Sequence, residues 1–394
     1  MVSKHNISIL SISQYGSDLA SIGARLSGAL ERQKDYAQYV EKYIVLVPTA
    51  KAAGAPTLYD GGLEIHTVHA TNVFTFFIAA YLKACTLHRA HTFDVLMVDN
   101  PHIGGILGVL LKWRLGVPLV IHSMADMLYN EWYNRERVLN HVKQLLMRVS
   151  VRYANVLRVS TQTEVRRLIA HNITAEKLAY VPFYIDGPKF QAELTQTSAE
   201  QKPMQILCVG RLSYQKDVGT LLKAFKEVVA ACPDATLVLA GSGSLRTVLE
   251  REATTLGIAS QVTFTGAIPY TEISRFFKES AVFALSSLYE GTCMVLHEAA
   301  TAGLPIVSTD NAGAQDFITN DGIGGTLVPV HDHHALAHAL IKMLTDGTFH
   351  TECSRRAETR VGAFSRTAAL EHWNNLCERL VVLSTKDKKV VKPT

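Results

Sequence analysis

The sequence of 394 residues has few cysteines, no long apolar run and almost no net charge. Its six cysteines are scattered without a Cys-x-x-Cys pair, and several, such as Cys208, stand in apolar runs. This usage favours buried, reduced thiols in a cytoplasmic protein. The longest apolar window of the first half, near 73–84, is only about half of a membrane-spanning length, so we expect no transmembrane helix. The net charge of +4 is too small to indicate a nucleic-acid partner.

Segments typical of strands and of helices alternate along the chain, and the alternation is interrupted once. The short apolar run 7–12, broken by serine, predicts a first strand and not a signal peptide. Over 186–203 the composition shifts to polar residues and proline, which predicts a linker. Because the chain is too long for one core, we predict an N-terminal domain over 1–185 and a C-terminal domain over 204–363. Each domain is expected to be α/β, with a parallel sheet and a ligand cleft at the carboxyl ends of the strands.

Basic residues alternate with apolar ones in a helix predicted over 135–153. A basic amphipathic helix can lie on an anionic membrane surface, whereas the alternative is a solvated helix packed against its own domain. Another helix is predicted over about 364–383, followed by a basic, polar tail over 384–394. We therefore expect a cytoplasmic protein, with peripheral contact at the inner face of an anionic membrane as the open alternative.

The most informative stretch runs from Tyr289 to Val307. It is typical of a glycine turn after a strand, a helix that stops at Gly303, and a further strand. Such a turn directs backbone N–H groups and the positive end of a helix toward a ligand, which suits a phosphate. Glu290 and Glu298 flank the helix start, and carboxylates suit sugar hydroxyls. Both features on one short element indicate a nucleotide sugar.

Two cations follow the strand predicted over 205–209. Arg211 and Lys216 belong to a Gly-Arg-Leu-Ser-Tyr-Gln-Lys loop and would lie over the carboxyl edge of the sheet. Arginine can bind a diphosphate through two hydrogen bonds and lysine as a point charge, although two surface cations in a loop are the alternative. Gly241 and Gly243 predict a tight strand-to-helix turn on the nucleotide side. The third glycine and the distant acid of a dinucleotide-binding fold are lacking.

Several motifs of the second half form one pattern, made of Gly210-Arg211 with Lys216, the turn Gly241–Gly243, Gly266, and Glu290 with Glu298. This pattern resembles the nucleotide-sugar half of the retaining family-four glycosyltransferases, the glycosyl transferases group 1. The resemblance covers about 205–345, and the Glu-x7-Glu element is its most specific part. It implies the GT-B fold, in which two Rossmann-like parallel-sheet domains face each other across a cleft and a C-terminal helix crosses back to the first domain.

The resemblance also implies roles for individual residues. Arg211 and Lys216 would hold the donor diphosphate and stabilise the leaving nucleotide. Glu298 would bind the ribose hydroxyls, and Glu290 would contact the donor sugar. In the first domain, His122 at a strand end would reach the donor sugar or phosphate, unless it is only a packed loop histidine. The predicted catalytic residues are Glu290, Arg211, Lys216 and His122. Further donor contacts are predicted at Gly16, Gly210, Gly241, Gly243, Gly266, Gly291, Thr292, Cys293, Met294 and Val295.

We therefore expect a retaining glycosyltransferase of polysaccharide biosynthesis that moves a sugar from a UDP-sugar or GDP-sugar to a hydroxyl of a glycan or a lipid-linked acceptor. No metal or other cofactor is expected, because Arg211 and Lys216 would replace the divalent ion and no obvious Asp-x-Asp pair accompanies them. Two histidines stand one turn apart, His334 and His338, but no acid or cysteine completes a metal-binding set, so a solvated helix start far from the cleft is expected. A non-catalytic nucleotide-sugar-binding partner subunit and a GT-B-fold nucleotide-sugar epimerase are the alternatives.

Overall fold

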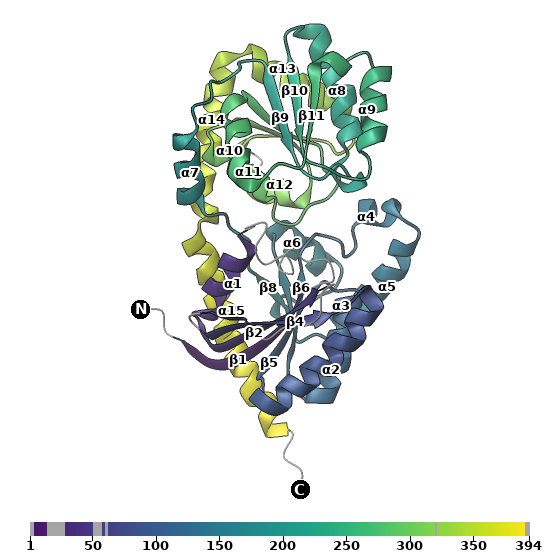
Figure 1. Ribbon diagram of the computed structural model, residues 1–394, viewed down its shortest axis with the longest axis vertical. Helices are drawn as coiled ribbons and strands as arrows, with labels where there is room; N and C mark the ends of the chain where they lie inside the picture. The colour runs from purple at the N-terminus through teal and green to yellow at the C-terminus, as the bar shows by residue number, and fades with distance from the viewer. Residues whose placement is uncertain (1–3, 14–27, 50–56, 60–61, 320, 391–394) are drawn as a thin grey trace.

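The structure is a computed structural model that describes residues 4–13, 28–49, 57–59, 62–319 and 321–390. It consists of two domains, one above the other in Figure 1, each built around its own sheet. Gly16 lies outside the described residues, and so does most of a helix expected over 19–30. Of the described helices, none is long and apolar enough to cross a membrane.

The N-terminal domain is built on an eight-stranded sheet with the order β3-β4-β2-β1-β5-β6-β7-β8. Neighbouring strands are parallel, except that β3 runs antiparallel to β4. The strands are β1 (His5–Ile12), β2 (Val40–Thr49), β3 (Thr57–Tyr59), β4 (Leu63–His69), β5 (Val95–Asp99), β6 (Leu119–Ser123), β7 (Val156–Val159) and β8 (Leu178–Tyr180). The helices are α1 (Ala29–Ala37), α2 (Val73–His91), α3 (Ile103–Leu115), α4 (Glu131–Glu136), α5 (Leu139–Tyr153) and α6 (Gln162–Ala170).

The C-terminal domain is built on a six-stranded parallel sheet with the order β11-β10-β9-β12-β13-β14. Its strands are β9 (Gln205–Val209), β10 (Thr236–Ala240), β11 (Val262–Gly266), β12 (Val282–Leu285), β13 (Ile306–Thr309) and β14 (Thr326–Val328). The main helices are α8 (Val218–Ala231), α9 (Arg246–Thr255), α10 (Tyr270–Glu279), α11 (Met294–Thr301), α12 (Ala312–Phe317), α13 (His333–Thr345) and α14 (Gly347–Val361), and a short 3-10 turn, η4 (Tyr214–Lys216), follows β9.

The strands are continuous apolar runs because each sheet is buried on both faces. In β12, Val282 and Ala284 join the core that contains side chains of α8 and α13. The alternate residues Phe283 and Leu285 join a second core, with side chains of α10 and α11. This alternation between two cores is the period of two that a strand imposes. The predicted α/β class and the two parallel-sheet domains are therefore confirmed.

The last helix, α15 (Arg366–Val390), returns from the C-terminal domain and packs on the N-terminal one (Figure 1). Trp373 is fully buried, stacks on Tyr36 with 4.3 Å between ring centroids, and donates its indole N–H to the Tyr36 carbonyl at 3.1 Å. The side chain of Arg366 is ion-paired with Asp35. The predicted crossover is therefore confirmed, but the helix, predicted to end near residue 383, continues to Val390. Lysine is a good helix former, which suits this continuation.

The segment predicted as a linker over 186–203 contains a helix, α7 (Gly187–Gln196). Asp186 caps it by accepting from the amide of Lys189 at 3.1 Å. Phe190 and Leu194 are buried in the core of the C-terminal domain. Two apolar side chains one turn apart are enough to hold this helix, and they are too few to give a clear periodicity in the sequence.

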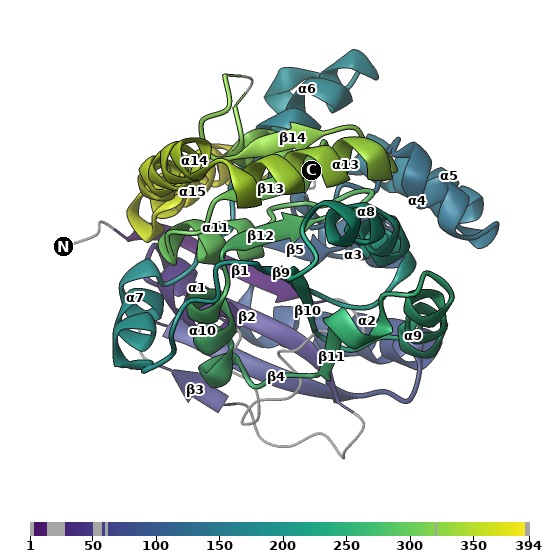
Figure 2. The same ribbon diagram turned by 90° about the horizontal axis from the view of Figure 1, so that it is seen from above.

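The basic helix predicted over 135–153 is two helices, α4 and α5. Arg137, between them, has extended backbone, with φ −153° and ψ 141°. The side-chain amide of Asn140 donates to the carbonyl of Tyr133 at 2.7 Å and holds the break. Figure 2 shows α4 and α5 at the side of the molecule opposite α14 and α15.

Candidate functional site

Two loops of the C-terminal domain meet at the carboxyl edge of its sheet. Because β9 and β12 are adjacent and parallel, the loops over 210–216 and 286–293 leave the same edge. The hydroxyl of Ser286 donates to the carbonyl of Lys216 at 2.8 Å, and the amide of Leu288 donates to the carbonyl of Gln215 at 2.8 Å. These bonds fix the cation-bearing loop against the loop that leads to Glu290.

Lys216 and Glu290 form an ion pair at this edge. The Lys216 Nζ lies 2.5 Å from Glu290 Oε1, and the side chains are only 14% and 11% exposed. Burial lowers the pKa of Lys216, but the attraction of Glu290 outweighs it and raises the pKa above its ordinary value. Gln215 donates to the carbonyl of Tyr289 at 2.9 Å and lies 3.4 Å from the second Glu290 oxygen. An ion pair that is almost out of solvent is thus held where the sequence predicts the donor to bind.

Arg211 lies in the same loop and is exposed, with its guanidinium donating to the Gln215 side-chain oxygen at 3.3 Å. The structure therefore brings Arg211, Lys216 and Glu290 to one place, with the Gln215 side chain in contact with both Arg211 and Glu290. An exposed arginine beside a buried lysine gives one cation that a ligand can reach freely and one that is fixed in position.

The glycines of this edge are required by close backbone packing. Gly241 has φ +153°, and a Cβ there would lie 1.9 Å from the carbonyl oxygen of Gly210. A Cβ at Gly243 would lie 2.1 Å from the carbonyl oxygen of Leu212. Gly266, at the end of β11, has φ +77° and bridges to Gly241. The predicted tight turn is confirmed, whereas contact of these glycines with a donor stays a prediction.

Glu298 lies in the second turn of α11 and is buried, with 9% exposed. Burial raises its pKa from 4.5 to about 7, although a hydrogen bond from Tyr270 opposes the shift. Cys293 begins the helix without a side-chain cap. The first-turn N–H groups of such a helix favour an anion. The helix start and its carboxylate therefore have the arrangement expected for a phosphate next to a ribose.

Part of the predicted donor segment instead contacts the N-terminal domain. A Cβ at Gly291 would lie 2.3 Å from the Met124 carbonyl oxygen, so only glycine fits there. The hydroxyl of Thr292 donates to the carbonyl of Ser160 at 3.0 Å, and its amide donates to the Ser160 hydroxyl at 3.3 Å. These contacts join the two domains. Donor binding by Gly291, Thr292, Cys293, Met294 and Val295 stays a prediction.

His122 lies in β6 of the opposing domain, two residues before Met124, and is 3% exposed. Its Nδ1 lies 3.3 Å from Asp99 Oδ1. Burial, with the charge of Arg158, lowers its pKa to about 4, so the imidazole is neutral at pH 7. If Nδ1 donates to Asp99, Nε2 is an acceptor. This Nε2 is buried and has no hydrogen-bond partner within the described part of the chain.

Sequence reasoning missed Asp99, Gln215, Ser160 and the contact of Tyr289 with Glu136. The Tyr289 hydroxyl donates to Glu136 at 2.6 Å, across the domain boundary. Asp99 could have been found, because it ends the strand next to β6 and pairs in register with His122. The other contacts join segments far apart in the sequence, and only the tertiary structure places them together.

The sequence predicts that the histidines of 331–338 lie far from the cleft, and the structure contradicts this prediction for His331. The Nδ1 of His331 lies 2.8 Å from the Oδ2 of Asp217, which directly follows Lys216, and the His331 ring lies 5.8 Å from that of Trp132 in α4. His333 and His334 instead meet Glu227 of α8, with ligand atoms within 4.8 Å of one another. Such a set is suited to a divalent metal such as zinc. Since Glu227 lies on a distant segment, the sequence could not assign it to this cluster.

Two family models match the chain. The model of glycosyl transferases group 1 matches residues 190–360, and that of the glycosyl transferase 4-like domain matches residues 42–183. The amylovoran biosynthesis glycosyltransferase AmsK of Erwinia amylovora is 28% identical over 260 residues, which are 64% of this chain and 61% of AmsK. The matched regions span 44% to 61% of the length of AmsK and two further curated relatives.

Solved structures share the arrangement of the whole chain. Sucrose-phosphate synthase from Thermosynechococcus elongatus has a TM-score of 0.76 at 18% identity, covering 95% of this chain and 99% of that one. HepE from Anabaena, in complex with UDP and glucose, has a TM-score of 0.71 at 18% identity, covering 96% and 100%. At such low identities, the TM-scores show a common fold. The C-terminal domain therefore belongs to the glycosyl transferases group 1 and the N-terminal domain to the glycosyl transferase 4-like domains, and together they make a chain of the GT-B fold.

Proposed function

We propose that this chain is a retaining, metal-independent glycosyltransferase that transfers a sugar from a nucleotide-diphosphate sugar to a hydroxyl acceptor. The observation that carries the proposal is the buried Lys216–Glu290 pair at the carboxyl edge of the C-terminal sheet. Glu290 lies in the loop whose Gly291 packs against the carbonyl of Met124, two residues after His122. Charged donor-binding groups and an unpartnered imidazole nitrogen thus belong to segments that meet between the domains.

Each group has a role in the proposed reaction. Lys216 and Arg211 stabilise the negative charge that develops on the departing diphosphate. Glu298, when ionised, accepts from the ribose hydroxyls, and His122 Nε2 accepts from a sugar hydroxyl. The leaving phosphate oxygen takes the acceptor proton on the same face of the sugar, which retains the anomeric configuration. This route is favoured because Glu290 is ion-paired with Lys216 and is therefore a poor nucleophile.

The acceptor is proposed to be a glycan or a lipid-linked intermediate, and the name of AmsK, an amylovoran biosynthesis glycosyltransferase, supports a glycan.

We also propose peripheral contact of α5 with an anionic membrane. Its Val142, Leu145 and Val149 are 53%, 62% and 40% exposed, and Arg148 and Arg152 are exposed beside them. Co-sedimentation with phosphatidylglycerol vesicles, but not with phosphatidylcholine vesicles, is the expected result.

The test begins with a thermal-shift screen of UDP, GDP and their sugars, since a ligand that binds the folded state raises the melting temperature. The stabilising donor is then incubated with acceptors, and the anomeric configuration of the product is determined by NMR. An inverted product contradicts retention, and loss of activity in EDTA contradicts metal independence. Binding without any turnover would favour a partner subunit, and an altered free donor sugar would favour an epimerase.

A further inference from the structure

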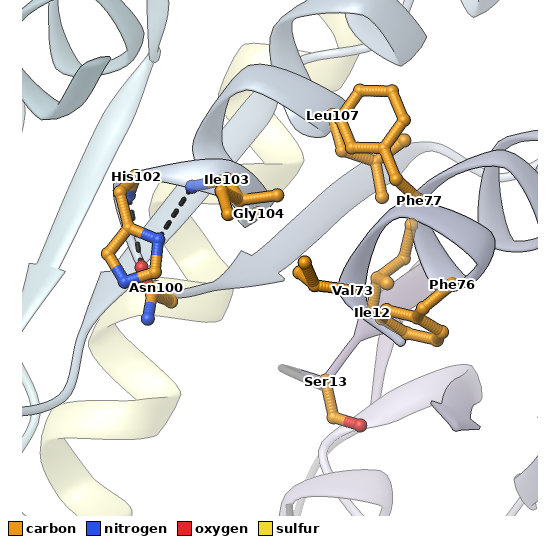
Figure 3. Close-up of a pocket in the computed structure, with 10 residues that line it drawn as sticks. All are labelled: Ile12, Ser13, Val73, Phe76, Phe77, Asn100, His102, Ile103, Gly104 and Leu107. Atoms are coloured by element: carbon orange, nitrogen blue, oxygen red, sulfur yellow. Dashed lines mark hydrogen bonds between the residues drawn. The ribbon is translucent and has the colours of Figure 1, made fainter. Parts of the chain in front are cut away.

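A cavity of about 270 Å³ lies between the carboxyl ends of β1 and β5 and the first turns of α2 and α3. Most of its wall is apolar, with Val73, Phe76 and Phe77 from α2 and further aliphatic side chains from β1 and α3. Figure 3 shows the rings of Phe76 and Phe77 on one side, and Asn100 with His102 on the other. An apolar hollow with one polar end suits a ligand that has a hydrocarbon chain and a polar head.

The polar end of the cavity lies at the carboxyl edge of the N-terminal sheet, where Asn100 follows β5. The amide of Asn100 donates to the carbonyl of His122 at 2.9 Å, and Asn100 directly follows Asp99. The Asn100 side chain accepts from the amide of His102 at 3.0 Å, and the His102 ring accepts from Ile103 at the start of α3 at 2.8 Å. A head group at this end would therefore contact Asn100 and His102, at the sheet edge where the backbone of His122 also lies.

The outer faces of α2, α3 and α5 form a surface that matches an anionic membrane. These helices, of 19, 13 and 15 residues, contain no Asp or Glu, although the chain has 35. They expose large apolar side chains, including Phe74 at 76%, Trp113 at 61% and Leu145 at 62%. The rings of Trp113 and Tyr153 meet at 5.3 Å between centroids, which joins the faces of α3 and α5. Basic side chains on the same helices, such as Arg152, would attract anionic lipid.

Helix α2 connects this surface to the cavity. Phe76 is buried at 5% exposed and lines the cavity, whereas Phe74 and Ile78, on either side of it in the sequence, are 76% and 61% exposed. One turn of the helix thus has apolar side chains both in the cavity wall and on the outer surface. A hydrocarbon chain leaving a bilayer at α2 would remain in contact with apolar groups until it entered the cavity.

We propose that the cavity binds the hydrocarbon chain of a lipid acceptor taken from an anionic membrane, with the hydroxyl-bearing head at Asn100 and His102. The inference rests on the proposed glycosyl transfer and narrows its acceptor to an amphiphile. A purely saccharide acceptor would leave its hydroxyls against the rings of Phe76 and Phe77, where they lack hydrogen-bond partners. A hydrocarbon chain gains from the same burial, by about three- to fourfold in affinity for each buried CH₂ group.

The experiment uses two matched thiol variants of the full chain. Val73→Cys places a thiol in the cavity wall, and Ile78→Cys places one on the exposed face of the same helix. Alkylation of each introduced thiol by iodoacetamide is followed by peptide mass spectrometry, with n-dodecyl β-D-maltoside below its micellar concentration as the probe and maltose as the head-group control. The probe should slow alkylation in Val73→Cys about tenfold at about ten times its Kd. The rate in Ile78→Cys should stay unchanged, and maltose should protect neither.

Three results would overturn the inference: no protection of the Val73→Cys thiol, equal protection of both thiols, or protection by maltose. Val73→Cys is nearly isosteric and Ile78 is exposed, so both variants keep the chain foldable, and the melting temperature of each variant verifies this. The thermal shift given by UDP and GDP is measured on the same samples. A protein that binds a nucleotide without protection by the probe refutes the chain-binding cavity alone. Protection by the probe without nucleotide binding refutes the proposed function instead.

Discussion

The carboxyl edge of the C-terminal sheet is held together by charge and by glycine packing, whereas the edge of the N-terminal sheet that faces it combines one buried imidazole with an apolar cavity. On the first edge, Lys216 and Glu290 form a pair that is almost out of solvent. On the second, His122 is neutral and Phe76 and Phe77 line the hollow nearby. A diphosphate needs fixed cations, while a chain needs only apolar area.

This difference explains why the ligand-binding residues of the C-terminal domain form recognisable sequence motifs and those of the N-terminal domain do not, although both domains have the same α/β architecture. Binding of a charged ligand requires particular residue types at a particular spacing, as in the Glu-x7-Glu element. Binding of an apolar ligand is possible with many different apolar side chains of similar size. The donor side can therefore be identified from short motifs, and the acceptor side depends on which apolar side chains the fold leaves without neighbours. Four substitutions test this difference between the two sheet edges.

The largest effect is expected for Lys216→Ala. It removes the fixed cation and leaves Glu290 buried without its partner, so we expect about a hundredfold loss of transfer and about 3–5 kcal/mol of lost stability. Steady-state kinetics and urea unfolding measure both. Lys223→Ala, on the exposed face of α8, is the control and should change neither. Retained turnover in Lys216→Ala would show that the donor edge does not depend on this charge.

A smaller effect, on the opposite edge, is expected for His122→Phe. It keeps a ring in the buried position and removes the Nε2 acceptor, so transfer should fall about tenfold to a hundredfold. UDP or GDP affinity, measured by calorimetry, should stay within about twofold, because these nucleotides lack the sugar that Nε2 would contact. A parallel loss of nucleotide affinity would instead assign His122 to the diphosphate.

Glu298→Gln is expected to alter the pH dependence of the donor side. Because burial raises the pKa of Glu298 to about 7, its contribution to stability is complete below pH 4.5 and is lost as the pH rises through 7. The stability of the variant should therefore match that of the parent at about pH 4 and exceed it by about 1–3 kcal/mol at about pH 8. Urea unfolding at both values tests this.

The Glu298→Gln variant should also separate the effect of Glu298 on folding stability from its effect on nucleotide affinity. Ionised Glu298 accepts from ribose hydroxyls, so nucleotide affinity of the parent should increase as the pH rises through 7, and the variant should lose this increase. A nucleotide affinity that does not depend on pH in the parent would exclude Glu298 from ribose recognition, whatever the stability shows.

The smallest effect is expected for Tyr289→Phe, which removes the hydrogen bond to Glu136 across the domain boundary. One such bond to a charged group contributes about 1.5–3 kcal/mol when it is intact, but several other contacts join the domains, so KM for the donor should rise only about two- to fivefold with kcat unchanged. Initial-rate kinetics over a range of donor concentrations measures both constants. A larger loss in kcat would indicate that domain closure is needed for the chemical step.

Much of the fold follows from local patterns. The apolar strands over 205–209 and 236–240 are predicted within one residue of their bounds, because each is a buried run ended by glycine. Helix α7 could not be predicted, since only Phe190 and Leu194 anchor it. The break between α4 and α5 was also missed, because Asn140 stabilises it through a bond to Tyr133 that no periodicity shows.

The sequence by itself determined that the chain has two α/β halves and that Arg211, Lys216, Glu290 and Glu298 belong to loops at strand ends, because both conclusions depend on period and on residue type near a turn. Only the tertiary structure decided that Lys216 pairs with Glu290, that Asp99 holds His122, that Glu227 joins His333 and His334, and that α2 separates an apolar cavity from an exposed apolar face. Each of these depends on a distance between segments that the chain places far apart, and such distances are fixed by the packing of side chains around both sheets.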